Sequence, residues 1–122
     1  MYEEYYKWFD GFMLQMNENL KEYLPRNDGT GDNERFRRYY VIGNDGKEHF
    51  IVHLRPAPTK RRINLLFGLN ERHLRLPDGC PPLESRDQSV PNYREFNLNM
   101  NDKSVEKVAL DLARQVADYH TK

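Results

Sequence analysis

The spacing of apolar residues changes twice along this chain, and that change restricts the folds available to it. In residues 2–24 apolar side chains recur every three or four positions, which is the period of one buried helix face. In residues 36–69 the period becomes two, as in strands with one buried face. After Asn101 and Asp102, whose side chains are suited to an N-cap, the helical period returns. The sequence therefore predicts strands bracketed by two amphipathic helices.

The two predicted helices each carry one apolar stripe. The stripe of the first consists of Tyr5, Phe9, Phe12, Met16, Leu20 and Tyr23. The stripe of the second consists of Val105, Val108, Leu112, Val116 and Tyr119. Two such helices can cover one face of a sheet.

The central region is predicted to be a meander of three antiparallel strands. Segments 36–42 and 47–55 flank an Asp-Gly turn signal at 43–46, and 61–69 alternates as a third strand. In 47–55, side-chain alternation divides the residues between two faces. We expect the core face to carry Phe50, Val52 and Leu54, and the opposite face to carry His49, Ile51, His53 and Arg55.

Segment 94–100 is predicted to be a further strand and 72–76 a short one, while 27–32 and 77–93 are predicted to be loops. The fold class is α+β: an antiparallel sheet of four to five strands covered on one face by the N- and C-terminal helices, in the order α-β-β-β-(β)-β-α. Residues 1–122 are expected to form a single domain. This order is similar to that of frataxin-like domains and of small secretion chaperones, a similarity that implies a fold and not a function.

Charge is sorted along the chain although the totals cancel, with 19 basic and 19 acidic side chains. Residues 35–75 hold ten Lys or Arg against three acids and carry a net charge of +7, whereas the segments on either side are acidic. Such a basic centre indicates either an anion-binding surface or a fold whose acidic helices neutralise it. Both interpretations stay open at this level.

For the anion-binding interpretation, cations and rings on one sheet face suit phosphates and stacked bases. The candidate residues for anion binding or electrostatic steering are Arg37, His53, Arg55, Lys60, Arg61 and Arg62. Tyr39 is the candidate stacking ring, provided that strand register places it on the same face. A sequence pI near 6.9 is lower than that of strongly basic nucleic-acid binders.

For a protein-binding interpretation, the N-terminal helix is apolar over more of its surface than one core stripe needs. Leu14 lies opposite the stripe, and Tyr6 and Trp8 lie at its margins. Aromatic side chains of this kind anchor interfaces. These three residues are the candidate partner-binding set, and the helix is the candidate surface for a homodimer.

The residues that most often perform chemistry do not form a recognisable set. His49 and His53 would be about 13 Å apart on a strand, too far to share a metal, and His73 and His120 lack partners at a metal-ligand spacing. Cys80, the only cysteine, has no visible base partner. We therefore expect no metal, no cofactor and no catalytic residues.

The leading functional hypothesis is a small non-catalytic intracellular protein-binding module, acting as an inhibitor, adaptor or chaperone in a regulatory role. The alternative is nucleic-acid or phosphate-ligand binding through the basic central sheet. A single cysteine and an acidic N-terminal segment without a signal-peptide pattern favour the cytoplasm. Apolar runs are far too short to cross a membrane, so no membrane partner is expected.

Overall fold

The computed structural model describes residues 1–30, 33–85 and 92–122, and it confirms the α+β fold class. Two long helices enclose five strands in the sequence: α1 (Glu3–Leu20), β1 (Arg26–Thr30), β2 (Asn33–Ile42), β3 (Glu48–Ala57), β4 (Arg62–Phe67), β5 (Arg94–Asn99) and α2 (Lys103–Thr121). Short 3-10 turns lie between them: η1 (Lys21–Tyr23), η2 (Pro58–Lys60) and η3 (Glu71–His73). The strands are antiparallel throughout and are ordered in the sheet as they are in the chain.

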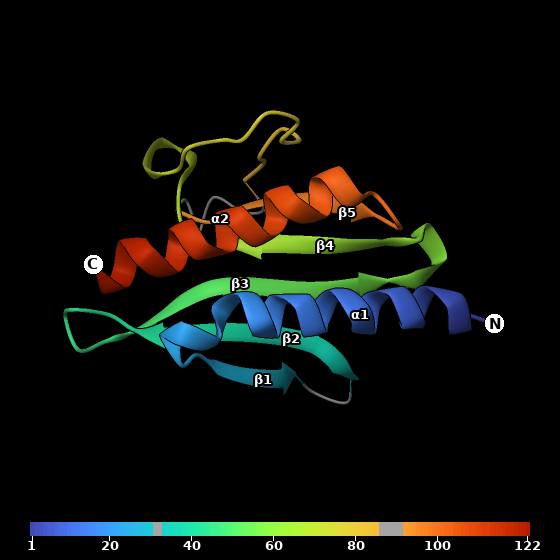
Figure 1. Cartoon of the computed structure of the whole chain (residues 1–122), viewed down its shortest axis with the longest axis horizontal. Coiled ribbons are helices and arrows are strands. Elements are labelled where there is room, and N and C mark those ends of the chain that lie inside the picture. Colours follow the sequence, from blue (N-terminus) through green and yellow to red (C-terminus); the bar gives the residue numbers. More distant parts are fainter. Residues whose placement is uncertain (31–32, 86–91) are drawn as a thin grey trace.

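Both helices lie on the same face of the sheet. In Figure 1, α1 runs in front of β2 and β3, and α2 runs in front of β4 and β5. We call the opposite face of the sheet the helix-free face; it consists of the side chains of β1–β5 that point away from α1 and α2. In the described part of the chain, neither helix combines the length and the apolarity needed to cross a bilayer.

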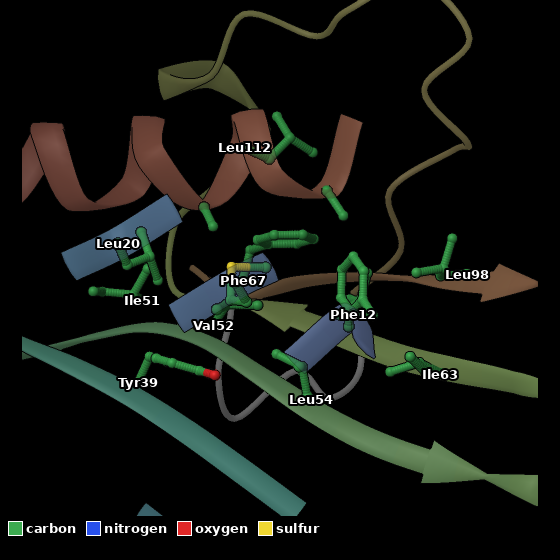
Figure 2. Close-up of a cluster of buried hydrophobic side chains, with 14 of the residues drawn as sticks. Phe12, Leu20, Tyr39, Ile51, Val52, Leu54, Ile63, Phe67, Leu98 and Leu112 are labelled. Carbon is green, nitrogen blue, oxygen red and sulfur yellow. The ribbon is translucent and has the colours of Figure 1, made fainter. Parts of the chain in front are cut away.

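The core lies between the helices and the sheet and follows the predicted stripes. Figure 2 shows Phe12 and Leu20 of α1 facing Val52 and Leu54 of β3. In α1 the stripe residues from Tyr5 to Leu20 are buried, and in α2 the buried residues follow the same helical period. Asp102 caps α2 as expected, because its Oδ1 accepts a hydrogen bond from the Val105 amide at 3.3 Å.

The fifth strand is not the predicted one. Segment 72–76 forms no strand; instead η3 begins after Asn70, whose side chain accepts the Arg72 amide at 3.1 Å and caps the turn. The additional strand is β1, in a segment predicted to be a loop. Its residues from Arg26 to Gly29 pair with β2. Arg26 also donates two hydrogen bonds of 2.9 and 2.6 Å to Glu48 of β3. These bonds reach over β2 and connect the edge strand β1 to β3.

A register shift reverses the predicted faces at the start of β3. Tyr39 pairs with Val52, whereas Tyr40 pairs with Phe50, so Ile51 is the extra residue of a bulge. Ile51 therefore joins Val52 in the core, where neither has any exposed surface. Phe50 turns to the helix-free face, where its ring contacts that of His53 at 5.8 Å. His49 pairs with the buried Val41 and stacks on His120 of α2, so it lies on the side of the helices. The prediction for His49, Phe50 and Ile51 was wrong because strict alternation does not survive a bulge.

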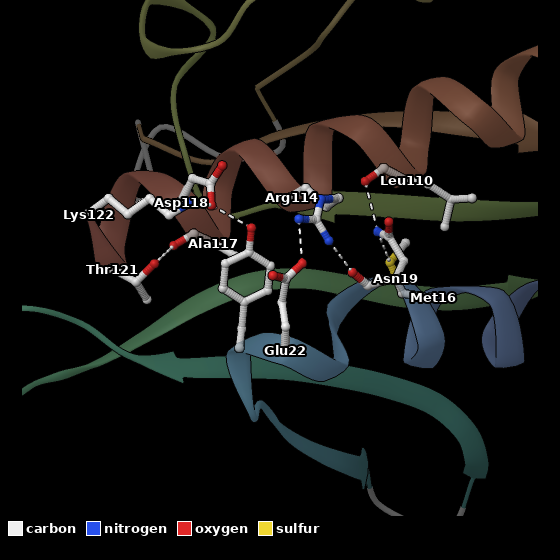
Figure 3. A network of polar contacts seen from close by, with 10 residues as sticks. Met16, Asn19, Glu22, Leu110, Arg114, Ala117, Asp118, Thr121 and Lys122 are labelled. Carbon is white, nitrogen blue, oxygen red and sulfur yellow. Dashed lines mark hydrogen bonds and ion pairs between the residues drawn. The ribbon is translucent and has the colours of Figure 1, made fainter.

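A polar network joins the ends of the two helices, as Figure 3 shows. Arg114 of α2 forms an ion pair with Glu22 and donates to the Asn19 carbonyl oxygen at 2.8 Å. Tyr23 donates its hydroxyl to Asp118, and Asn19 donates to the Leu110 carbonyl oxygen at 2.9 Å. These bonds fix η1 against α2 at the point where the chain leaves α1 for β1.

Candidate functional site

The helix-free face carries cations, rings and amides in cross-strand rows. One row runs from Arg38 of β2 to His53 of β3, and the next from Phe36 through Arg55 to Asn64 and Asn97. Arg62 of β4 lies on the same face, because its neighbour Ile63 points into the core. The antiparallel meander thus brings together residues that lie up to 61 positions apart in the sequence.

The cationic groups of this face contact rings and one imidazole. Arg38 donates through Nε to Nε2 of His53 at 3.1 Å. The Arg55 guanidinium lies 5.9 Å from the centre of the Phe36 ring, within cation–π range. Arg38 is exposed, and Arg55 and Arg62 are partly exposed. A ligand on this face would therefore meet guanidinium groups beside ring surfaces.

Aromatic rings form a second part of the helix-free face. Tyr40 of β2 and Phe50 of β3 have ring centres 5.7 Å apart, and Tyr93 reaches Phe50 at 5.2 Å. The Arg26 guanidinium lies 4.4 Å above the Tyr40 ring. All of these rings are partly exposed. Partly exposed rings on a pleated surface are suited to contact with planar groups.

Two acids of this face, Asp28 and Glu48, lie at its β1 edge, where Arg26 binds both and offsets one of their two negative charges. Arg26 pairs with both Asp28 and Glu48, and the hydrogen bonds from Arg26 lower the pKa of the Glu48 carboxyl. Towards the other edge, Glu95 of β5 lies in the row of His53 and Leu66. Among the described residues, no carboxylate lies within ion-pair distance of Arg38 or Arg62.

The predicted anion-binding residues are divided by the fold. His53, Arg55 and Arg62 lie on the helix-free face, although His53 is only 8% exposed. Lys60 and Arg61 lie in the β3–β4 connection beside Arg62, and Arg61 adopts the left-handed conformation with φ of 51°. There Arg61 approaches Glu4 of α1 at 3.5 Å, so one acidic helix does neutralise part of the basic block.

Arg37 and Tyr39 lie on the other face of the sheet. Arg37 pairs with Leu54 and Tyr39 with Val52, both of which point towards the helices. Nε of Arg37 is buried and donates to no group that the structure describes. Tyr39 has no exposed surface, and burial raises the pKa of its hydroxyl, which donates to Asn17 Oδ1 at 2.6 Å. Tyr39 is thus a core residue, and Phe36 and Tyr40 provide the rings of the helix-free face.

The predicted partner-binding residues of α1 also separate. Trp8 is 8% exposed and donates through Nε1 to Oε2 of Glu106 on α2 at 3.3 Å, so it belongs to the interior of the helical layer. Tyr6 is partly buried, and the Arg35 guanidinium covers its ring at 4.3 Å. Leu14 is 64% exposed and has the position expected of a surface contact.

Sequence reasoning missed Arg38, Phe36 and Asn97 as members of one surface. A partial signal was present in the sequence. Because side chains alternate along a strand, Phe36, Arg38 and Tyr40 share the face opposite to that of Tyr39, whichever strand they pair with. The register that places these residues beside His53 and Arg55 depends on the bulge at Ile51, and no turn residue marks that bulge.

The described residues contain no group of three or more His, Cys, Asp or Glu positioned to hold a metal ion. Burial raises the pKa of the Cys80 thiol, which is the opposite of what activates a nucleophile. Comparison with protein-family models, with curated proteins and with solved structures finds no significant match for this chain. The arrangement of the site is therefore the basis for assigning a function.

Proposed function

We propose that this protein is a non-catalytic binding protein that binds single-stranded nucleic acid on the helix-free face. The observation that carries the proposal is the alternation, on one surface, of guanidinium groups with partly exposed rings: Arg38, Arg55 and Arg62 with Phe36, Tyr40 and Phe50. Cations bind the phosphates of a strand, and rings accept its bases.

The form of the surface favours a single strand over a duplex. Rings can stack only on bases whose faces are accessible, and bases in a duplex are stacked on each other. The amides of Asn64 and Asn97, which are bonded to each other at 3.3 Å, add donors and acceptors suited to base edges. Lys60 extends the cationic surface at the β3–β4 end, while Arg61 beside it is paired with Glu4.

A net charge of zero does not oppose this function, because the fold separates the charges. Arg26 binds Asp28 and Glu48, while Arg35 binds Asp10 of α1 at 3.3 Å on the helix-covered side. The acids that offset the basic block are thus largely held at one edge and on α1. A strand crossing β2–β4 would meet mainly positive charge.

The test is the salt dependence of binding to a labelled single-stranded oligonucleotide. The logarithm of the association constant is expected to fall linearly with the logarithm of salt concentration, by about 0.7 for each phosphate contacted. Arg38→Gln and Arg62→Gln should each lower the affinity and reduce that slope by about 0.7. Arg75→Gln is the matched control, because the Arg75 side chain is exposed and its backbone is bonded to Gln115 of α2, outside the helix-free face.

Two outcomes would contradict the proposal. One is the absence of binding at about 50 mM salt, where phosphate contacts are strongest. The other is equal loss of affinity in all three variants, because binding would then follow total charge and not this surface.

Leu14 supports a second candidate function, binding to another protein or to a second copy of this chain through α1. Its side chain is 64% exposed on the side of α1 that faces away from the core. If α1 mediates self-association, Leu14→Glu shifts the mass measured by light scattering from dimer to monomer. An unchanged mass would remove α1 as a dimer surface. For either function we propose a cytoplasmic location, which the single partly buried Cys80 favours.

A further inference from the structure

A polar pocket of about 400 Å³ lies at the end of the molecule where the C-terminus is located (Figure 1). Four parts of the chain form its walls: the start of β3, the residues after β4, η3 and the end of α2, with Asn92 and Tyr93 beside them. Three of the four histidines line it, namely His49, His73 and His120. The sequence separates these residues by up to 71 positions, so only the fold reveals the cluster.

The pocket is held in shape by close packing of the β2–β3 turn on α2. The rings of His49 and His120 stack with centres 4.2 Å apart and planes 7° from parallel. The backbone N–H of Asn44 donates to the His120 carbonyl oxygen at 2.9 Å. A Cβ on Gly43 would lie 2.6 Å from the His49 ring, and one on Gly68 would lie 2.0 Å from the Phe50 carbonyl oxygen. Glycine is therefore required at both positions for the walls to approach as they do.

Several of the lining groups can donate hydrogen bonds to a ligand. Arg72 donates through Nε to Nε2 of His73 at 3.2 Å, which leaves its two terminal nitrogens for other acceptors. The His73 ring packs against that of Tyr119 at 5.0 Å. Because Nε2 of His73 accepts from Arg72, the neutral His73 ring can donate through Nδ1, whereas Nε2 of His49 is bound by Asp45. The phenols of Tyr93 and Tyr119 and the side-chain amides of Asn70 and Asn92 can also donate to oxygen.

The carboxylates around the pocket are already bound. Both carboxylate oxygens of Asp45 lie 2.9 Å from Nε2 of His49, within hydrogen-bond distance. Glu48 is held by Arg26, and Glu71 forms an ion pair with Arg94. Among the described residues, no carboxylate lies within ion-pair distance of Arg72. The pocket thus has one guanidinium and several neutral donors available, and each carboxylate beside it is already bound to a donor.

From these observations we propose that the pocket binds the phosphate group of a small phosphate monoester. A doubly charged oxyanion matches a planar guanidinium beside imidazole donors, because charge-assisted bonds to phosphate are short and strong. The volume exceeds that of phosphate alone and lies within the range of small-molecule sites. The rings of Phe50, Tyr93 and Tyr119 give the organic part of the ester an aromatic wall.

This site is separate from the one proposed for nucleic acid. Phe50 and Tyr93 border both, but Arg72 lies in η3 and not on the sheet face. Arg72→Gln is therefore expected to leave oligonucleotide binding unchanged. The two proposals can fail independently.

The experiment is a titration of the full chain with inorganic phosphate and with phenyl phosphate at pH 7, followed by the NMR signals of the histidine rings. We expect both to shift the signals of His49 and His73, with phenyl phosphate binding more tightly. Arg72→Gln should weaken both by about tenfold or more, as loss of a charged hydrogen bond does. Arg75→Gln, outside the pocket, should leave both affinities unchanged.

Absence of saturable shifts with either compound would overturn the proposal, as would equal affinities in the wild type and Arg72→Gln. Binding of inorganic phosphate without phenyl phosphate would contradict a monoester as the ligand. A thermal unfolding curve of Arg72→Gln that matches the wild type establishes that a lost affinity reflects the site and not the fold.

Discussion

At the scale of single residues, the least expected side chain is Glu106, which is 2% exposed within the helical layer. Its carboxylate accepts hydrogen bonds from Nε1 of Trp8 at 3.3 Å and from Nε2 of Gln15 at 3.4 Å, and Lys103 lies 3.5 Å away. A buried carboxylate is tolerated only when donors surround it. Trp8, which from sequence is a candidate contact for a partner, is one of these donors.

Replacing Trp8 by phenylalanine tests this structural role. Trp8→Phe keeps an aromatic ring but removes the donor to Glu106, so we expect a loss of about 1–3 kcal/mol in the free energy of unfolding. Urea unfolding followed by circular dichroism measures it. Leu14→Ala on the exposed side of the same helix should stay within about 0.5 kcal/mol of the wild type. Equal stability of Trp8→Phe and the wild type would contradict the assignment.

His120 gives the molecule a pH dependence whose direction follows from its surroundings. Burial, together with the charge of the stacked His49, lowers the pKa of His120 below its ordinary value of 6.5, although a hydrogen bond at Gly68 and the Asp45 carboxylate oppose the shift. Because the unfolded chain then binds the proton more readily, folding is favoured above pH 6.5 and this contribution is lost as pH falls through the lowered pKa.

We therefore expect the free energy of unfolding to fall between pH 7 and pH 5, and to fall less steeply in His120→Phe. Phenylalanine keeps a planar ring against His49 but cannot bind a proton. Urea unfolding across this pH range in both proteins gives the comparison, with the Asp45–His49 pair common to the two. Parallel pH profiles would show that His120 does not contribute.

At the scale of elements, what the sequence predicts well is periodicity, and what it misses depends on pairing. The stripes from Tyr5 to Leu20 and from Val108 to Val116 predict both helices, because each stripe is a local property of its segment. Strand β1 has no apolar alternation, since its sequence RNDGT is polar. It is stabilised by pairing with β2 and by the hydrogen bonds from Arg26 to Glu48 of β3. Such tertiary contacts leave no pattern in the strand itself.

The network at the ends of the helices predicts a local effect of Arg114. Arg114→Met removes the ion pair with Glu22, the bond to the Asn19 carbonyl oxygen and the contact with the Tyr23 ring at 5.3 Å. We expect a loss of about 1–2 kcal/mol in the free energy of unfolding, because Arg114 is partly exposed and solvent weakens its ion pair. Backbone amides of η1 should also exchange hydrogen faster.

The control for this variant is Lys107→Met, at an exposed position of the same helix where the structure shows no ion pair within the described residues. We expect it to change stability by less than about 0.5 kcal/mol. If hydrogen exchange in η1 rises equally in both variants, the network does not hold this turn.

At the scale of the whole molecule, the basic block predicted from sequence is divided into two faces. Arg55 and Arg62 lie on the helix-free face as expected, and Arg37 lies on the other. The sorting of charge along the chain thus identifies the correct region, while the face of Arg37 depends on the register of β2 on β3. The polar pocket lined by His49, His73 and His120 could not be predicted from the sequence, because its walls come from segments that are distant in the chain.

The side-chain amides of asparagine can report whether single-stranded nucleic acid binds on the helix-free face, because they lie on both sides of the sheet. Asn64, Asn97 and Asn99 lie on that face, while Asn17 and Asn19 are bonded to Tyr39 and Leu110 on the helix-covered side. NMR spectra recorded during titration with a short oligothymidylate at about 50 mM salt report both faces at once. If the nucleic acid binds on the helix-free face, we expect the NMR signals of the Asn64, Asn97 and Asn99 side-chain amides to shift. Those of Asn17 and Asn19 should stay unchanged. Shifts confined to Asn17 and Asn19, or no shifts at all, would contradict it.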